Sequence, residues 1–254
     1  MQQAVNRVQD NDFIRALLQR ARELGFRSTN LDLIYGLPLQ TRASFRHTLE
    51  QVVAMRPARL SIFNYAHLPA RFAGQHKIRE DQLPAPAEKL AMLQETIGYL
   101  TAQGYQYIGM DHFALPDDEL AIAQREGKLH RNFQGYTTQG ECDLLGLGVS
   151  SISMLGDAYS QNQKELKAYY AALDAQGQAQ WKGCALSADD LVRRDVIKQL
   201  ICNFRLDYAE IEQRYALSFA EYFAVDLALL APFVADGLVV LEPHGIRVST
   251  TGRL

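Results

Sequence analysis

Apolar residues at helical spacing alternate with short apolar runs in the first half of the chain. Spacings of three and four residues predict helices over residues 10–24, 41–55 and 85–103. Each helix leads into a short apolar run that is typical of a buried strand, over residues 28–35, 59–65 and 105–110. This alternation predicts parallel strands in an α/β sheet or barrel, and about three visible units are too few for a closed barrel of eight.

The second half has a different pattern. After His112 the strand rhythm disappears, and Gly and polar residues from Gly127 to Asn162 predict a loop-rich connector with short helices. Helical spacing returns in four segments, near residues 163–175, 187–203, 208–215 and 218–235. Two short apolar runs around the turn at 242–245 then resemble a winged-helix hairpin.

Composition and charge narrow the function classes. With 26 basic and 29 acidic residues, the net charge of -3 gives no general reason to bind nucleic acid or an anionic membrane. No apolar run approaches the roughly 20 residues of a membrane span, and the polar first residues are no signal peptide, so we expect a cytoplasmic protein. The three cysteines, Cys142, Cys184 and Cys202, suit reduced, buried thiols, and no Cys-x-x-Cys pair suggests a metal site.

Several chemically active side chains follow the predicted strands. Asp32 could hold a ribose or an amine, or it could cap a turn, and the spacing leaves both interpretations open. Asp111 and His112 could form a general acid–base pair, but adjacent strand residues face opposite sides, which favours a core or turn role. The six histidines are scattered, so no zinc site is expected.

Two segments of the connector contain candidate ligand-binding residues. The residues from Gly146 to Ser153 superficially resemble a phosphate-binding loop, but they lack the third glycine and the strand-loop-helix setting. Lys128, His130 and Arg131 precede Phe133, so three cations could grip carboxylates beneath a flat ring. A solvated basic loop anchored by Phe133 is the alternative that the spacing alone favours.

Four motifs carry a resemblance to a known family. They are residues 30–38 (NLDLIYGLP), 63–69 (FNYAHLP), 109–114 (GMDHFA) and 130–138 (HRNFQGYTT). Together they resemble the bacterial oxygen-independent coproporphyrinogen III oxidases, which are radical S-adenosylmethionine (radical SAM) enzymes. The resemblance runs through nearly all of the chain, and the last two motifs are much more specific than the first.

The resemblance implies a fold and a division of the chain. Residues 1–115 would be the C-terminal part of a partial (β/α)6 radical SAM barrel, residues 116–182 an active-site connector, and residues 183–254 a mostly helical domain with a winged-helix-like end. The family's Cys-x-x-x-Cys-x-x-Cys motif, which binds a 4Fe-4S cluster, does not occur in these 254 residues. We therefore expect a truncated chain, inactive alone, whose cluster ligands lie upstream.

The resemblance also implies site residues. Positions that contact S-adenosylmethionine in the family are matched by Arg7, Asp32, Ala66 and Ile152, and active-site positions near this cofactor by Phe133 and Gln134. Ser151 stands where the family has a small apolar alanine. We further hypothesise that Lys128 and Arg131 bind substrate carboxylates, because they lie close to Phe133 and Gln134 in the sequence.

The implied activity is the anaerobic oxidative decarboxylation of coproporphyrinogen III. A 5'-deoxyadenosyl radical would convert two propionate side chains to vinyl groups, giving protoporphyrinogen IX in heme biosynthesis. The expected partners are this substrate and an unidentified electron donor and acceptor, and we expect a monomer that binds no nucleic acid.

Two functions other than decarboxylation are alternatives for this chain. A heme-binding or heme-transferring radical SAM relative would keep the Asp32 motif, but the segment from Phe133 to Tyr136 argues against it. A DNA-binding winged-helix regulator would use the helix at 218–235, which carries Glu221 and Asp226 and no Lys or Arg. The terminal helices are more simply explained as a lid over the barrel, with Arg193 and Arg194 solvated.

Overall fold

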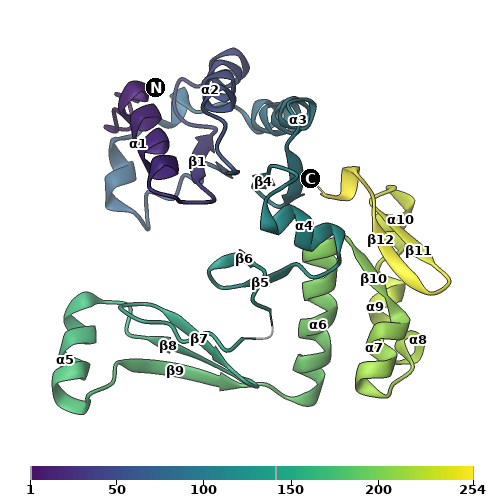
Figure 1. The fold of residues 1–254 in the computed structure, drawn as a ribbon. Coiled ribbons are helices and arrows are strands. Elements are labelled where there is room, and N and C mark those ends of the chain that lie inside the picture. The colour runs from purple at the N-terminus through teal and green to yellow at the C-terminus, as the bar shows by residue number, and fades with distance from the viewer. Residues whose placement is uncertain (1, 141, 254) are drawn as a thin grey trace. The chain divides into compact units, whose positions relative to one another are not determined.

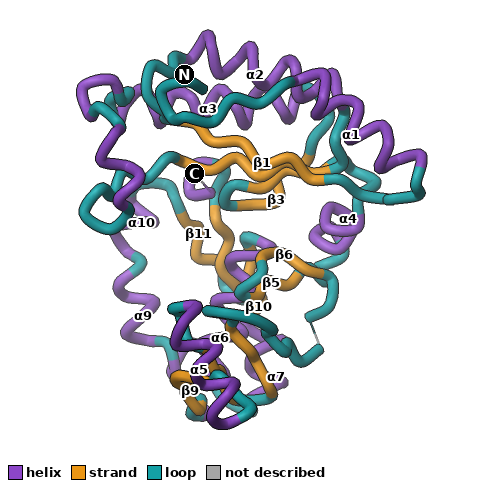
Figure 2. The backbone as a smooth tube through the Cα atoms, turned by 90° about the vertical axis from the view of Figure 1, so that its left-hand side faces the viewer, coloured by secondary structure: helices purple, strands orange, loops and turns teal. Residues whose placement is uncertain are grey.

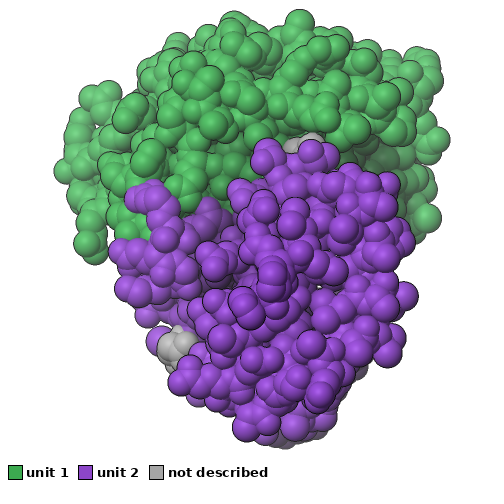
Figure 3. Space-filling model, turned by 90° about the vertical axis from the view of Figure 1, so that its right-hand side faces the viewer, with its two compact units in different colours: residues 1–122, 254 green, residues 123–253 purple. Residues whose placement is uncertain are grey.

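The computed structural model describes residues 2–140 and 142–253. The chain divides into two compact units, which we call unit 1, up to Ile122, and unit 2, Ala123–Arg253 (Figure 3). No helix in the described part of the chain is long and apolar enough to cross a membrane.

Unit 1 has the elements that the hydrophobic spacing predicts (Figure 1). Helices α1, α2 and α3 and strands β1, β2 and β3 lie within the predicted ranges, which confirms these predictions: α1 (Asn11–Glu23), β1 (Asn30–Tyr35), α2 (Arg42–Met55), β2 (Arg59–Asn64), α3 (Pro86–Ala102) and β3 (Gln106–Gly109). Local chemistry explains the boundaries. A capping box between Thr41 and Ser44 begins α2, and Pro86, whose missing N–H needs no partner there, begins α3.

The sheet of unit 1 corrects the expectation of parallel strands throughout. Strands β1 and β2 are parallel, but β4 (His112–Ala114) pairs antiparallel with both β2 and β3, giving the order β1-β2-β4-β3. The reason is a tight turn, in which Gly109 and Met110 take positive φ angles of 138° and 51°. The turn folds β4 back between its neighbours, and the strands described in residues 2–140 and 142–253 close no barrel.

Helices α2 and α3 cover one face of this sheet (Figure 2). Their apolar stripes pack on Leu60, Ile62 and Phe113, which are almost completely buried. In β1 the side chains of Leu31 and Leu33 join this core, and the alternating Asp32 lies on the opposite, exposed face. The sheet therefore has one packed face and one face open to chemistry.

Unit 2 corrects the prediction of an irregular connector with short helices. Short helix α4 (Glu119–Arg125) spans the boundary between the units, and five strands follow, with one helix among them: β5 (His130–Asn132), β6 (Gly135–Thr137), β7 (Ile152–Leu155), β8 (Ala158–Asn162), α5 (Leu166–Gln176) and β9 (Gln180–Ala185). Strands β5 and β6 form a hairpin, and β7, β8 and β9 form an antiparallel sheet. These strands are short and largely polar, so apolar alternation did not reveal them.

The C-terminal part of unit 2 combines helices with a small sheet. Its elements are α6 (Ala188–Asn203), β10 (Arg205–Asp207), α7 (Tyr208–Tyr215), α8 (Phe219–Tyr222), α9 (Ala224–Leu229), α10 (Ala231–Ala235), β11 (Val239–Glu242) and β12 (Gly245–Val248). The helix predicted at 218–235 is thus three short helices, and Pro232, in the first turn of α10, cannot donate to a continuous helix. The predicted terminal hairpin is confirmed as β11 and β12, which pair with β10 in a three-stranded sheet.

Candidate functional site

The open face of the unit 1 sheet carries the first group of candidate residues. Asp32 stands opposite Ser61 in the register of β1 and β2, and Ser61 stands opposite His112 of β4. The carboxylate of Asp32 accepts a hydrogen bond from the side-chain amide of Asn30 at 2.7 Å. Asp32 therefore lies within the strand, and its carboxylate faces outward on the side opposite the helices.

Asp111 and His112 do not lie together on one strand. Asp111 belongs to the turn before β4, where its backbone oxygen accepts from Ile62 N at 2.7 Å. His112 lies on β4, edge-on to the ring of Phe63 with centroids 6.1 Å apart. The turn or core role favoured by sequence is borne out for Asp111, and His112 shares the open face with Asp32.

Ala66 lies just beyond the carboxyl end of β2. The N–H of Tyr65 donates to the Tyr35 oxygen at 2.8 Å, so the two strand ends are held together. The exposed Ala66 follows at once, and its carbonyl accepts from the side chain of Gln75 at 3.1 Å. Gly36, with φ at 81°, leaves room for the stem of Lys89, which a Cβ would meet at 2.9 Å.

Arg7 lies in the exposed turn that precedes α1. Its backbone N–H donates to the Gln2 oxygen at 3.0 Å, and its side chain is exposed. Three of the predicted cofactor positions, Arg7, Asp32 and Ala66, therefore belong to unit 1, while Phe133, Gln134 and Ile152 belong to unit 2.

The β5–β6 hairpin displays the two predicted active-site residues at its tip. Asn132 and Gly135 are paired, so Phe133 and Gln134 form a two-residue turn. The side chain of Asn132 accepts from the backbone N–H of Gln134 at 2.8 Å, and Gly135 has a φ of 123°. This turn leaves both side chains exposed.

Phe133 and Ile152 meet around one pocket. The ring of Phe133 stands edge-on to Tyr159 of β8, with centroids 5.4 Å apart. These two rings and Ile152, the first residue of β7, line a pocket of about 290 Å³. The structure thus brings together two positions that the resemblance selected 19 residues apart, and it adds Tyr159, which could not be found without knowing β8.

The two cations proposed for substrate carboxylates have different surroundings. Lys128 is highly exposed and pairs with Glu126 at 2.9 Å. Arg131 of β5 lies over the ring of Tyr136, 4.9 Å from its centroid, and lines a second cavity of about 650 Å³. Arg194 and Lys198 of α6 line the same cavity. The side chain of Arg194 is only 22% exposed, so the expectation that it is solvated is wrong. Arg194 and Lys198 are four residues apart, and this helical spacing was the sequence feature that could have placed both on one face of α6.

The glycine-containing loop does not form a phosphate cradle of the usual kind. Strand β7, and no helix, follows the loop, and the Gly148 oxygen accepts from Ser151 Oγ at 2.8 Å. A Cβ on Gly146 would lie 2.6 Å from the Ile152 oxygen. The close backbone approach therefore serves the packing of β7, which explains the glycine without a ligand.

Metal ligands are also absent from the described residues. Within 2–140 and 142–253, no group of three or more His, Cys, Asp or Glu side chains could hold a metal ion. Of the cysteines predicted to be buried, Cys202 is buried, but Cys142 and Cys184 are exposed.

Comparison with known proteins identifies the family. Residues 186–254 match the model of the HemN C-terminal domain family. Proteins named oxygen-independent coproporphyrinogen III oxidase are similar over the whole chain: one from Escherichia coli K12 at 65% identity and one from Pseudomonas aeruginosa PAO1 at 54%. The chain spans 56% and 55% of these relatives, so it corresponds to about half of their length.

A shorter relative and a solved structure agree. The protein of the same name from Thermostichus vulcanus is 47% identical, and the match covers 100% of this chain and 78% of the relative. The structure of E. coli coproporphyrinogen III oxidase (HemN), described as a radical SAM enzyme, superposes with a TM-score of 0.97 at 66% identity, covering 100% of this chain and 58% of that one. The chain belongs to the oxygen-independent coproporphyrinogen III oxidase family.

Proposed function

We propose that this chain carries part of the active site of an enzyme that oxidatively decarboxylates coproporphyrinogen III. Two propionate side chains become vinyl groups, and the product is protoporphyrinogen IX. The observation that carries the proposal is the shared pocket of Phe133 and Ile152, because two positions that the resemblance selected far apart in the sequence line one small volume. The names of the relatives, which include coproporphyrinogen III oxidase from E. coli, support the same reaction.

S-adenosylmethionine is the cofactor that the family implies, and unit 1 fits it. When bound, it supplies a 5'-deoxyadenosyl radical that removes a hydrogen atom from a propionate chain. Asp32 is an exposed carboxylate on the open face of the sheet, suited to a ribose or to a positively charged group. Ala66 offers a small apolar surface in the loop after β2, and Arg7 offers a cation. We assign these three residues to cofactor binding.

The 4Fe-4S cluster does not fit the described residues. No group of three or more His, Cys, Asp or Glu side chains that could hold a metal occurs within 2–140 and 142–253. We therefore propose that the cysteine ligands of the cluster come from sequence outside these 254 residues.

Unit 2 contributes the residues that face the reaction. Phe133 and Gln134, at the tip of a short hairpin, would position the reacting groups, and the apolar walls of Phe133 and Ile152 would keep water away from a reactive radical. Arg131 and Lys128 remain the proposed partners of substrate carboxylates. We also propose that residues 1–115 are the C-terminal part of a partial barrel, with residues 116–182 as active-site connector and residues 183–254 as a mostly helical domain with a winged-helix-like end.

The test is anaerobic turnover of coproporphyrinogen III. The chain is joined to the upstream segment of the E. coli relative that carries the cluster cysteines, and it is supplied with S-adenosylmethionine and a reductant. Replacing Gln134 with Ala should abolish protoporphyrinogen formation, while Gln213→Ala, an exposed change on α7, should not. Stoichiometric heme binding without product would instead assign a heme-transferring function.

The proposal includes the location, oligomeric state and electron partners of the enzyme. We propose a cytoplasmic monomer that receives electrons from one partner and passes the final electron to another, neither identified. Ultracentrifugation of the joined protein at micromolar concentration checks the monomer, and a stable dimer would contradict it.

A further inference from the structure

The cavity of about 650 Å³ in unit 2 is lined by both cationic and apolar side chains. Its size falls within the range of about 300–1,000 Å³ that is usual for small-molecule sites. Cationic side chains line it from two elements, Arg131 from β5 and Arg194 and Lys198 from α6. It lies beside the small pocket described above, because Phe133 and Tyr159 line both.

The helix α6 presents its part of this lining as a single face. Arg194, Ile197, Lys198 and Ile201 are three and four residues apart, so they share one side of the helix, with cations and branched apolar side chains interleaved. The β5–β6 hairpin is fastened to the same helix, since the Tyr136 hydroxyl donates to the Ile201 oxygen at 3.3 Å. The two cationic walls are therefore held by packed elements before any ligand arrives (Figure 1).

The guanidinium groups of this cavity include donors without acceptors. Within the described residues, Nη1 of Arg131 and Nε of Arg194 are buried and have no hydrogen-bond partner. Asp195 lies 3.9 Å from Arg194 Nε, beyond hydrogen-bond reach, and its carboxylate instead accepts from Arg214 and Tyr215 at 2.7 and 2.6 Å. Buried guanidinium donors are normally satisfied, and carboxylates are their strongest partners.

Two other charged side chains of the lining, Asp190 and Arg193, are bonded to partners next to the cavity. Asp190 lines the cavity but accepts from the backbone and hydroxyl of Ser187 at 2.9 and 2.7 Å, as the cap of α6. Arg193 also lines the cavity, and its charge is balanced by Asp189 at 2.9 Å and Asp226 at 3.3 Å. Three further cations, Arg131, Arg194 and Lys198, line the same cavity.

The apolar part of the lining is suited to a flat or puckered ring. Phe133 is 56% exposed and Ile197 is 57% exposed. Together with Tyr159 they give the cavity an apolar surface interleaved with the cations. A ligand that fits this arrangement has an extended apolar ring with carboxylates at its edge.

We propose that this cavity is the porphyrinogen-binding subsite, in which Arg194 and Lys198, with Arg131 opposite, bind propionate carboxylates while the ring lies against Phe133 and Tyr159. This assignment rests on the proposed function. It adds Arg194 and Lys198 of α6 to the residues proposed to bind substrate carboxylates.

The experiment is a fluorescence titration of the joined protein with coproporphyrin III, the stable oxidised form of the substrate. Arg194→Gln and Lys198→Gln should each weaken binding about tenfold, the effect of losing about 1.4 kcal/mol. The matched control is Lys167→Gln, which removes one exposed cation of α5 outside the cavity and should leave binding unchanged. The tetramethyl ester of coproporphyrin III has no ionised carboxylates, so it should not compete with coproporphyrin III for binding. This comparison uses the unchanged protein.

Three results would overturn the subsite: no binding of coproporphyrin III by the joined protein, equal binding by the α6 variants, or effective competition by the ester. The turnover assay separates this failure from failure of the proposed function. If the joined enzyme makes protoporphyrinogen and Arg194→Gln leaves its KM unchanged, the decarboxylase stands and the subsite falls. If coproporphyrin binding depends on α6 but no product forms, the subsite stands and the decarboxylase falls.

Discussion

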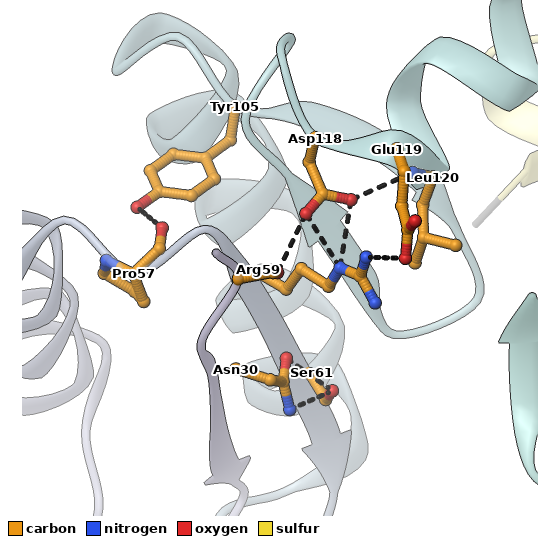
Figure 4. A network of polar contacts seen from close by, with 9 residues as sticks. Asn30, Pro57, Arg59, Ser61, Tyr105, Asp118, Glu119 and Leu120 are labelled. Atoms are coloured by element: carbon orange, nitrogen blue, oxygen red, sulfur yellow. Dashed lines mark hydrogen bonds and ion pairs between the residues drawn. The ribbon is translucent and has the colours of Figure 1, made fainter. Parts of the chain in front are cut away.

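Arg59 at the start of β2 places its Nε 2.9 Å from the carboxylate of Asp118, whose side chain is only 3% exposed (Figure 4). The same carboxylate accepts from Ser28 Oγ and from the backbone N–H of Leu120, both at 2.9 Å. The remaining arm of Arg59 reaches Glu119 at 2.8 Å. One buried carboxylate thus ties the first turn of α4 to the amino end of the parallel strands.

Replacing Asp118 with Ala should strongly destabilise unit 1. The change leaves the partly buried Arg59 guanidinium with one partner, and breaking a buried ion pair in this way typically costs about 3–5 kcal/mol. Urea unfolding followed by circular dichroism measures the loss. Asp81→Ala, which removes the exposed partner of Arg79, is the control and should leave the midpoint unchanged. Equal midpoints for the two variants would contradict this role of Asp118.

Asp195 should make the stability of unit 2 depend on pH. Burial alone would raise its pKa, but hydrogen bonds from Tyr215 and Arg214 outweigh burial and leave the pKa below the ordinary 3.8. The ionised form therefore stabilises the fold above pH 4, and this contribution disappears as the pH falls through the lowered pKa. Asp195→Asn should cost about 1.5–3 kcal/mol at pH 7 and much less at pH 2. A penalty that is the same at both pH values in thermal unfolding would refute the assignment.

The three cysteines should react with alkylating reagents at very different rates. Burial raises the pKa of the Cys202 thiol to about 11, even though Arg131 and Lys198 act in the opposite direction. Because the thiolate is the reactive form, iodoacetamide at pH 8 should label Cys142 and Cys184 and spare Cys202. Mass spectrometry of peptides from native and urea-unfolded protein checks this, and rapid native labelling of Cys202 would show that it is accessible.

Gly146 and Gly98 should respond in opposite directions to alanine. A Cβ at Gly146 would press on the Ile152 oxygen at 2.6 Å, so Gly146→Ala should lose about 1–3 kcal/mol and displace the wall of the small pocket. Gly98 lies inside α3 with nothing within 4 Å, and Gly98→Ala should gain about 0.5–1 kcal/mol. Differential scanning calorimetry gives both signs, and an unchanged Tm for Gly146→Ala would show that β7 adjusts freely.

The positions of most helices were predictable because their causes are local. The capping box of Thr41 and Ser44 and the apolar stripe of α2 lie within one short stretch of sequence, and the same holds for Ser187, Asp190 and α6. The motif residues Asp32, Ala66 and Phe133 could likewise be selected from the sequence, since short motifs identify positions without knowledge of packing.

Strand pairing depended on partners far away in the chain. Tyr159 of β8 pairs with Cys184 of β9, and α5 lies between these strands in the sequence. No pattern within β8 or β9 predicts this pairing. The antiparallel insertion of β4 was equally hidden, because it follows from the positive φ of Met110 and not from the apolar run. Sheets are stabilised by hydrogen bonds between segments, so local propensity predicts them less well than helices.

By itself, the sequence determined most of the helices, the first strands and the positions of the family's motifs. Only the tertiary structure placed Phe133 against Tyr159 and set Arg131 across a cavity from Arg194 and Lys198. The physical reason is that the identity of a side chain is fixed by sequence, whereas its burial, its partners and its unfilled donors exist only after distant segments have packed together.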